Sequence, residues 1–173
     1  MFSWFAALVF NALPAASPAP TPAPHCIQLV STTDVHGHLE PEEHHAGAFS
    51  VAQGGLPGFA GYLDIVRAKY RGQVLLLDSG DLFQGTVPSN LSKGAAVVVA
   101  YNAMHYDAAA LGNHEFDYGP EGTEKDLLGA LKKRFEEAHF PFLAANVYEA
   151  ATHQRVKWPN FAASHLFSWA GSR

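Results

Sequence analysis

Val74-Leu75-Leu76-Leu77-Asp78-Ser79-Gly80-Asp81 joins a wholly apolar run to a polar turn that carries two carboxylates and a glycine. Four consecutive apolar residues next to such a turn are typical of a buried β-strand, so the carboxylates follow the carboxyl end of a strand. The same arrangement occurs twice more. Ile27 to Thr32 precedes Asp34-Val35-His36-Gly37-His38, and Ala108 to Leu111 precedes Gly112-Asn113-His114-Glu115. The chain therefore presents three strands that each end in a polar cluster.

Segments with helical periodicity separate these strands. Leu56 to Tyr70 places apolar residues three and four positions apart, and Pro57 suits the first turn of a helix. Gly94 to Tyr106 also fits a helix, although its run of three valines, Val97 to Val99, fits a strand as well. The polar, glycine-containing segment from Glu40 to Gly55 is expected to be a loop. Strands that alternate with helices predict an α/β fold built on a largely parallel sheet.

A third helix and a fourth strand complete the pattern. Thr123 with Asp126 resembles a capping box at the start of a helix. The expected buried stripe of this helix consists of Leu127, Leu128, Leu131 and Phe135. Its expected solvated face consists of Lys132, Lys133, Arg134 and Glu136. Pro141 ends the helical stretch, and Phe142 to Val147 is expected to be the fourth strand.

The polar clusters at the strand ends carry ligands for divalent metal ions. Loops at the carboxyl ends of neighbouring parallel strands meet at one edge of a sheet, which brings distant residues together. The residues collected there are Asp34, His36, Asp81, Asn113 and His114. Carboxylate, imidazole and amide groups are metal ligands, and one carboxylate can bridge two cations. Two cations about 3.5–4 Å apart supply a hydroxide near neutral pH and hold phosphoryl oxygens for in-line attack. The sequence therefore predicts two-metal phosphoester chemistry.

His114 and Asp117 form a second functional pair. His114 is placed to donate a proton to a phosphoryl or leaving-group oxygen. Asp117, three residues further on, can orient the imidazole and keep it protonated. An equal alternative is that Asp117 closes the turn Asp117-Tyr118-Gly119-Pro120.

Each candidate also has a plain structural interpretation. Asp34 fits a turn acceptor, Asp81 a helix N-cap, and Asn113 a residue in left-handed backbone geometry. His38 fits either a residue that supports a metal ligand or an ordinary loop residue, and His44-His45 fits solvated loop histidines. Three clusters in order, each after an apolar run, favour metal chemistry over these separate interpretations.

Composition and charge exclude some classes of partner. The 173 residues are 48% hydrophobic and 16% charged, which places the chain among ordinary globular domains. A formal net charge of −5 without basic runs does not suit a phosphate backbone, so no nucleic-acid polymer is expected as a partner. A single cysteine, Cys26, excludes an internal disulfide.

Residues 1–24 are interpreted as a signal-like apolar segment followed by a tether. Phe2 to Leu13 is almost wholly apolar and too short to span a bilayer, although no Lys or Arg precedes it. Pro14 to Pro24 is rich in proline and alanine, as extended tethers are. We therefore expect a folded domain over residues 25–173, no stable membrane span, and a secreted, periplasmic or cell-surface location.

The clusters and their flanks resemble the calcineurin-like metallophosphoesterases, and within them the 5′-nucleotidase family. The resemblance rests on Thr33 to Pro41, Asp78 to Asp81 and Leu111 to Gly119, and it runs from about Ile27 to about Phe161. The run Gly-Asn-His-Glu-Phe-Asp is specific to that branch, whereas Asp-x-His and Gly-Asp mark only the superfamily.

The resemblance implies a fold, a reaction and residue roles. The fold is an α/β (α+β sandwich) metallophosphatase core of two sheets flanked by helices, of which this chain holds the front portion. The reaction is hydrolysis of phosphoesters, with a small nucleotide as substrate and two divalent ions, zinc or manganese, as cofactors. The implied ligands are Asp34 and His36 for one ion, Asp81 bridging both, and Asn113 for the other. The implied catalytic dyad is His114 with Asp117.

The chain also departs from the family pattern. The family adds later histidines, including a Gly-His-x-His element, whereas the later histidines here are His139, His153 and His165 in other contexts. By that comparison one ion lacks one protein ligand and the other lacks two. The family's second domain, which holds the base, has no counterpart here. Two alternatives stay open: a phosphodiesterase or nucleotide-sugar hydrolase of the same superfamily, or a truncated, non-catalytic remnant.

Overall fold

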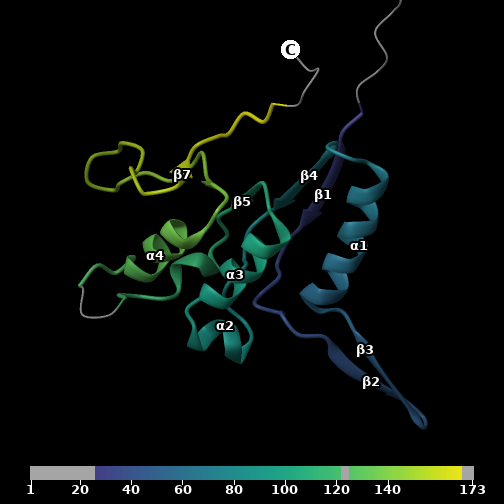
Figure 1. The fold of residues 1–173 in the computed structure, drawn as a ribbon. Helices are drawn as coiled ribbons and strands as arrows, with labels where there is room; N and C mark the ends of the chain where they lie inside the picture. Colours follow the sequence, from purple (N-terminus) through teal and green to yellow (C-terminus); the bar gives the residue numbers. More distant parts are fainter. Residues whose placement is uncertain (1–25, 122–124, 169–173) are drawn as a thin grey trace, which may run out of the picture.

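The computed structural model describes residues 26–121 and 125–168, and a five-stranded sheet organises them (Figure 1). The strands lie in the order β1 (Gln28–Thr32), β4 (Val74–Asp78), β5 (Ala108–Ala110), β6 (Phe142–Leu143) and β7 (Phe161–Ala162). Every neighbouring pair is parallel. The predicted α/β fold with a parallel sheet is confirmed. The carboxyl ends of β1, β4 and β5 consequently lie side by side at one edge.

Four α-helices accompany these strands within the described residues. They are α1 (Gly55–Lys69), α2 (Val87–Leu91), α3 (Ala95–Met104) and α4 (Gly129–Glu137). The valine run predicted either as helix or as strand is helical and belongs to α3. The buried residues of α3 are Val97, Val98, Tyr101 and Met104, a spacing that lies on one face of a helix, while Val99 is 68% exposed. Burial of that face outweighs the low helix propensity of valine.

One face of the sheet packs against the helices and forms the core. Leu76 and Phe142 point from the strands into this core, where they meet Tyr101 of α3 and Phe135 of α4. The ring centroids of Phe135 and Phe142 are 4.7 Å apart. On the other face, Leu29 is 65% exposed beside a shallow hollow, so the described residues cover that face incompletely.

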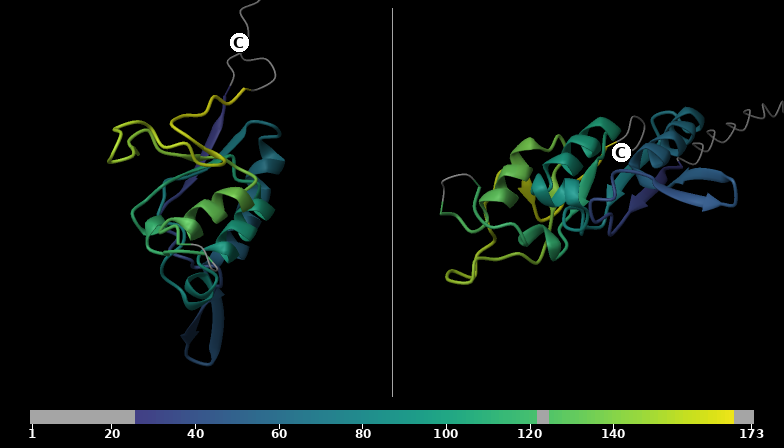
Figure 2. Two further views of the ribbon diagram at one scale, coloured as in Figure 1. Left: turned by 90° about the vertical axis from the view of Figure 1, so that its left-hand side faces the viewer. Right: turned by 90° about the horizontal axis from the view of Figure 1, so that it is seen from below.

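The prediction of a loop from Glu40 to Gly55 is wrong. Strands β2 (Glu42–Ala46) and β3 (Phe49–Gln53) form an antiparallel hairpin that projects from the rest of the molecule (Figures 1 and 2). Gly47, with φ of 64°, begins the two-residue turn, a position where such hairpins require positive φ. Both faces of the hairpin are exposed, so no alternation of buried and solvated residues marks it in the sequence.

The start of the third helix was also predicted wrongly. Helix α4 begins at Gly129, and the carboxylate of Asp126 accepts a hydrogen bond from the Leu128 N–H in the preceding turn; Thr123 lies outside the described residues. Leu127 is 74% exposed instead of buried, although Leu131 and Phe135 are buried as predicted.

Arg134 is buried rather than solvated. Its guanidinium donates to the carbonyls of Ser92 and Lys93 and pairs with the Glu137 carboxylate, Nε to Oε2 2.8 Å. These acceptors satisfy a charge that would otherwise be costly to bury. A charged residue that packs across a helix end looks like a surface residue in the sequence alone.

The last strands are short. β6 stops at Leu143 instead of reaching Val147, and β7 was not predicted, because two residues give no periodic pattern. The signal-like segment and tether predicted for residues 1–24 lie outside the described residues. Within residues 26–121 and 125–168, no helix has both the length and the apolar character needed to cross a bilayer.

The fold generates a test of the core. Leu76 is fully buried and Leu91 is 82% exposed, so the same substitution can be compared at both sites. We expect Leu76→Ala to lower the free energy of unfolding by about 2–5 kcal/mol, because it removes buried contacts and leaves a cavity. Leu91→Ala should change it by less than about 0.5 kcal/mol. Urea denaturation measures both, and equal losses would contradict the assigned core.

Candidate metal centre

The loops after β1 and β4 run side by side beyond the ends of the strands. The backbone N–H of Asp34 donates to the Gly80 carbonyl at 3.0 Å, and that of His36 donates to the Asp81 carbonyl at 3.0 Å. The pairing of the two chains thus continues into the polar loops, with a shift of one residue between these two bonds. It fixes the position of the first cluster relative to Asp81.

The polypeptide is strained at three of the predicted ligands. Asp34, His36 and Asp81 have φ values of 52°, 48° and 58°, in the left-handed region that residues with a side chain rarely occupy. Such geometry costs on the order of 1 kcal/mol or more per residue and persists only where the surroundings enforce it.

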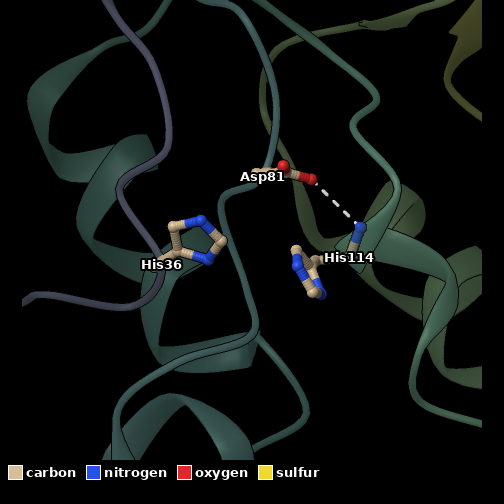
Figure 3. A group of neighbouring side chains, drawn as sticks. All are labelled: His36, Asp81 and His114. Atoms are coloured by element: carbon tan, nitrogen blue, oxygen red, sulfur yellow. Dashed lines mark hydrogen bonds between the residues drawn. The ribbon is translucent and has the colours of Figure 1, made fainter.

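Three side chains from three different strand ends converge at this edge. One ligand atom from each of His36, Asp81 and His114 lies within 4.8 Å of the others, and Figure 3 shows them around a common space. The two imidazole centroids are 5.1 Å apart. All three residues are partly buried, so they are held by the protein and still accessible from solvent.

The hydrogen bonds of His36 define which ring nitrogen faces the cluster. Nδ1 lies 2.7 Å from the Gln84 carbonyl, and a carbonyl only accepts, so Nδ1 carries the proton. Nε2 then has a free lone pair and lies 3.8 Å from Oδ1 of Asp34. An imidazole fixed in this way by a backbone carbonyl is typical of metal-binding histidines.

His114 and Asp117 lie in direct contact. Nδ1 of His114 is 2.6 Å from Oδ2 of Asp117, and this hydrogen bond raises the pKa of His114 above the ordinary histidine value. Asp117 also donates its own N–H to the His114 carbonyl at 3.3 Å, so it takes part in the local turn as well. This is the 3₁₀ turn that starts at His114, and residues 117–120 form no turn, so the alternative that Asp117 closes the turn Asp117-Tyr118-Gly119-Pro120 is wrong.

The remaining candidates take up positions around this cluster. Asn113 is exposed immediately before a short 3₁₀ helix (His114–Phe116), and its φ of −77° shows that the left-handed interpretation is wrong. Asp81 is not the N-cap of α2; Thr86 is. His38 is exposed 3.9 Å from Glu42, and His44-His45 belongs to the projecting hairpin, so neither joins the cluster.

Two buried carboxylates beneath the site were not singled out from the sequence. Asp78 accepts from the hydroxyls of Thr32 and Tyr101 and from the Gly80 N–H, while Glu115 accepts only backbone N–H groups. Burial raises the pKa of both carboxyls, against the lowering effect of these hydrogen bonds. Both residues stand inside the quoted clusters, but their burial leaves no sequence signal beyond that position.

The charge balance of the site fits divalent cations. Among the residues that the structure describes, neither Lys nor Arg forms an ion pair with Asp34, Asp81 or Asp117. Carboxylates that gather without a basic partner repel one another and repel a phosphate. Together with the imidazoles they form a mixed oxygen and nitrogen donor set of the kind that binds divalent metal ions.

The chain belongs to the calcineurin-like phosphoesterase family, because the model of that family matches residues 27–168. It is 42% identical over 123 residues to snake venom 5′-nucleotidase from Crotalus adamanteus and 41% identical over 123 residues to human 5′-nucleotidase. Each alignment covers 70% of this chain and 20% of the relative, so the chain spans about a fifth of the length of these curated relatives.

A solved structure shows the same fold. The 5′-nucleotidase precursor from Thermus thermophilus superposes with a TM-score of 0.68 at 36% identity. The superposition covers 85% of this chain and 27% of the other. The family and the metallophosphatase fold expected from the sequence motifs are thereby confirmed.

The contact between His114 and Asp117 predicts a pH effect. We expect Asp117→Asn to lower the pKa of His114 toward the ordinary value of 6.5 in metal-free protein, because a neutral amide stabilises the imidazolium less. In the wild type, the raised pKa contributes stability that is complete below pH 6.5 and is lost as the pH rises through the folded-state pKa. NMR titration of the ring protons measures the pKa. Glu136→Gln, at an exposed position of α4, is the control. An unchanged His114 titration in Asp117→Asn would contradict the hydrogen bond between His114 and Asp117.

The close approach of two loops generates a second test. A Cβ atom at Gly112 would collide with the carboxylate of Asp81, whereas one at Gly61 in α1 meets nothing within 4 Å. We expect Gly112→Ala to displace that carboxylate and weaken Mn²⁺ binding by about 10-fold or more. Gly61→Ala should leave binding unchanged. Titration calorimetry compares the variants, and equal affinities would show that Asp81 does not contribute to binding.

Proposed function

We propose that this chain carries part of the active site of a 5′-nucleotidase-type phosphoesterase that hydrolyses nucleotide phosphoesters. The observation that supports this most is the convergence of His36, Asp81 and His114 from three strand ends. Among the described residues, no Lys or Arg forms an ion pair with Asp34, Asp81 or Asp117. The similarity to 5′-nucleotidases from snake venom and human gives the proposed substrate class.

Asp34, His36, Asp81 and Asn113 are the proposed metal ligands. Asp34 and His36 would hold one ion, Asp81 would serve both, and Asn113 would hold the other through its amide oxygen. Zinc or manganese bound there would supply a hydroxide nucleophile near neutral pH. The left-handed backbone at Asp34, His36 and Asp81 supports this assignment, since such strain concentrates at functional sites.

His114 and Asp117 are the proposed catalytic dyad. Asp117 accepts the Nδ1 proton, which orients the imidazole and stabilises its protonated form. The protonated Nε2 then donates to a phosphoryl oxygen or to the leaving group as negative charge develops there. His36 lies across from this ring, and because its Nδ1–H is held by a carbonyl, its Nε2 is the proposed ligand atom.

A second candidate function is metal binding without efficient turnover. In the described residues the cluster holds three His, Asp or Glu side chains, one of which is the proposed proton donor, and the later histidines His139, His153 and His165 are not among them. We therefore expect the full 173-residue chain to hydrolyse nucleoside monophosphates far more slowly than a full-length relative. A panel containing AMP, a cyclic nucleotide and a nucleotide sugar separates the 5′-nucleotidase, phosphodiesterase and nucleotide-sugar hydrolase alternatives.

The N-terminal segment and the venom relative support export as the proposed location.

Metal content and turnover together test the proposal. Elemental analysis of protein exposed to zinc and manganese should find bound ions, and retention of neither would contradict the metal centre. We expect His114→Ala to lower any phosphoester hydrolysis by about 100-fold or more while metal content stays largely unchanged. His139→Ala, at an exposed position, is the control. Loss of metal in His114→Ala would instead assign His114 as a ligand.

A further inference from the structure

Glu115 is a buried carboxylate that faces the backbone of two loops. Its side chain is 1% exposed, and no Lys or Arg in the described residues pairs with it. Oε1 accepts the N–H groups of Leu82 at 2.7 Å and Phe83 at 3.2 Å. Oε2 accepts those of Asp81 at 2.9 Å and Gly112 at 2.7 Å. Four backbone donors therefore converge on one side chain.

These hydrogen bonds form a closed ring that links Asp81, the proposed bridging ligand, to His114, the proposed proton donor. Glu115 accepts the Asp81 N–H, and Oδ1 of Asp81 in turn accepts the His114 N–H at 3.0 Å. His114 is joined covalently to Glu115, so the ring consists of two hydrogen bonds and a short piece of chain (Figure 3 shows the bond from Asp81 to His114). Neither Asp81 nor His114 can shift without breaking one of these hydrogen bonds.

The same bonds hold the strained backbone at Asp81. Its φ of 58° is unfavourable, and the three successive N–H groups from Asp81 to Phe83 point to one carboxylate in that conformation. Hydrogen bonds from backbone N–H to a charged carboxylate are stronger than neutral ones, especially where water is excluded. These hydrogen bonds therefore hold the strained backbone of Asp81 in its left-handed conformation.

We propose that Glu115 is a positioning residue of the metal centre, which fixes the loop after β4 to the loop after β5 and so sets the distance between Asp81 and His114. The proposal rests on the proposed function of the site. It assigns Glu115 no contact with metal or substrate. Its effect is transmitted through the Asp81 carboxylate.

Replacement of one oxygen by an amide nitrogen tests this role. In Glu115→Gln, the remaining oxygen can accept from one pair of N–H groups, while the NH₂ group meets the other pair, donor against donor. We expect the affinity for Mn²⁺ to fall about 10–100-fold, as it does when residues that support metal ligands are changed. Titration calorimetry with the full chain, below the unfolding transition of each variant, measures this. Glu136→Gln is the matched control at an exposed position and should leave the affinity unchanged.

Amide hydrogen exchange in metal-free wild type tests the same contacts without any substitution. The N–H groups of Asp81, Leu82, Phe83 and Gly112 should exchange far more slowly than those of exposed loops. Exchange at the rate of exposed amides overturns the proposal even if Glu115→Gln does not fold. Glu115→Asp, which keeps the charge but is one methylene shorter, should have an intermediate affinity for Mn²⁺.

The outcomes separate this inference from the proposed function. If Glu115→Gln is less stable but binds Mn²⁺ as tightly as the wild type, Glu115 only stabilises the fold and the positioning role fails alone. If the wild type itself binds neither Mn²⁺ nor Zn²⁺, the metal centre fails, and the positioning role fails with it whatever the amide exchange shows.

Discussion

The whole site depends on backbone pairing that continues past the ends of the strands. β1 and β4 are in register up to Thr32 and Asp78. Beyond that point the bonds from Asp34 to Gly80 and from His36 to Asp81 keep the two chains paired, with a shift of one residue between them. Beyond the end of a strand, the chain normally enters a surface loop that does not pair with the neighbouring chain. Here the loops remain joined, and side chains separated by dozens of residues are held in a space a few ångströms wide.

Two buried carboxylates, those of Asp78 and Glu115, extend these hydrogen bonds from the surface into the interior. Asp78 ties the end of β4 to Thr32 and Tyr101, and Glu115 ties the following residues to the loop after β5. Tyr101 stacks on Tyr106 with ring centroids 3.8 Å apart, which links these polar bonds to the hydrophobic core. The proposed site therefore lies above a layer of hydrogen-bonded polar groups, and that layer packs against the aromatic rings of the core.

The sequence indicated the parts of this arrangement that follow from periodicity and order. The apolar runs, the helix from Gly55 to Lys69 and the clusters at three strand ends were predictable, because each has a local pattern. The hairpin β2–β3 has no buried face and therefore no pattern to detect. Arg134 and Glu115 owe their positions to backbone partners far away in the chain, and a charged residue carries no sequence sign of such burial. The residue types of the site were predictable; their supporting bonds were not.

The left-handed conformation of Asp81 has a consequence for how this protein can change. Glycine would occupy that position with less strain, so a mutation there to the residue that the backbone favours would remove the carboxylate and relax the chain together. Relief of backbone strain and the proposed metal binding are therefore opposed at Asp81, where glycine would also leave the N–H of His114 without its acceptor.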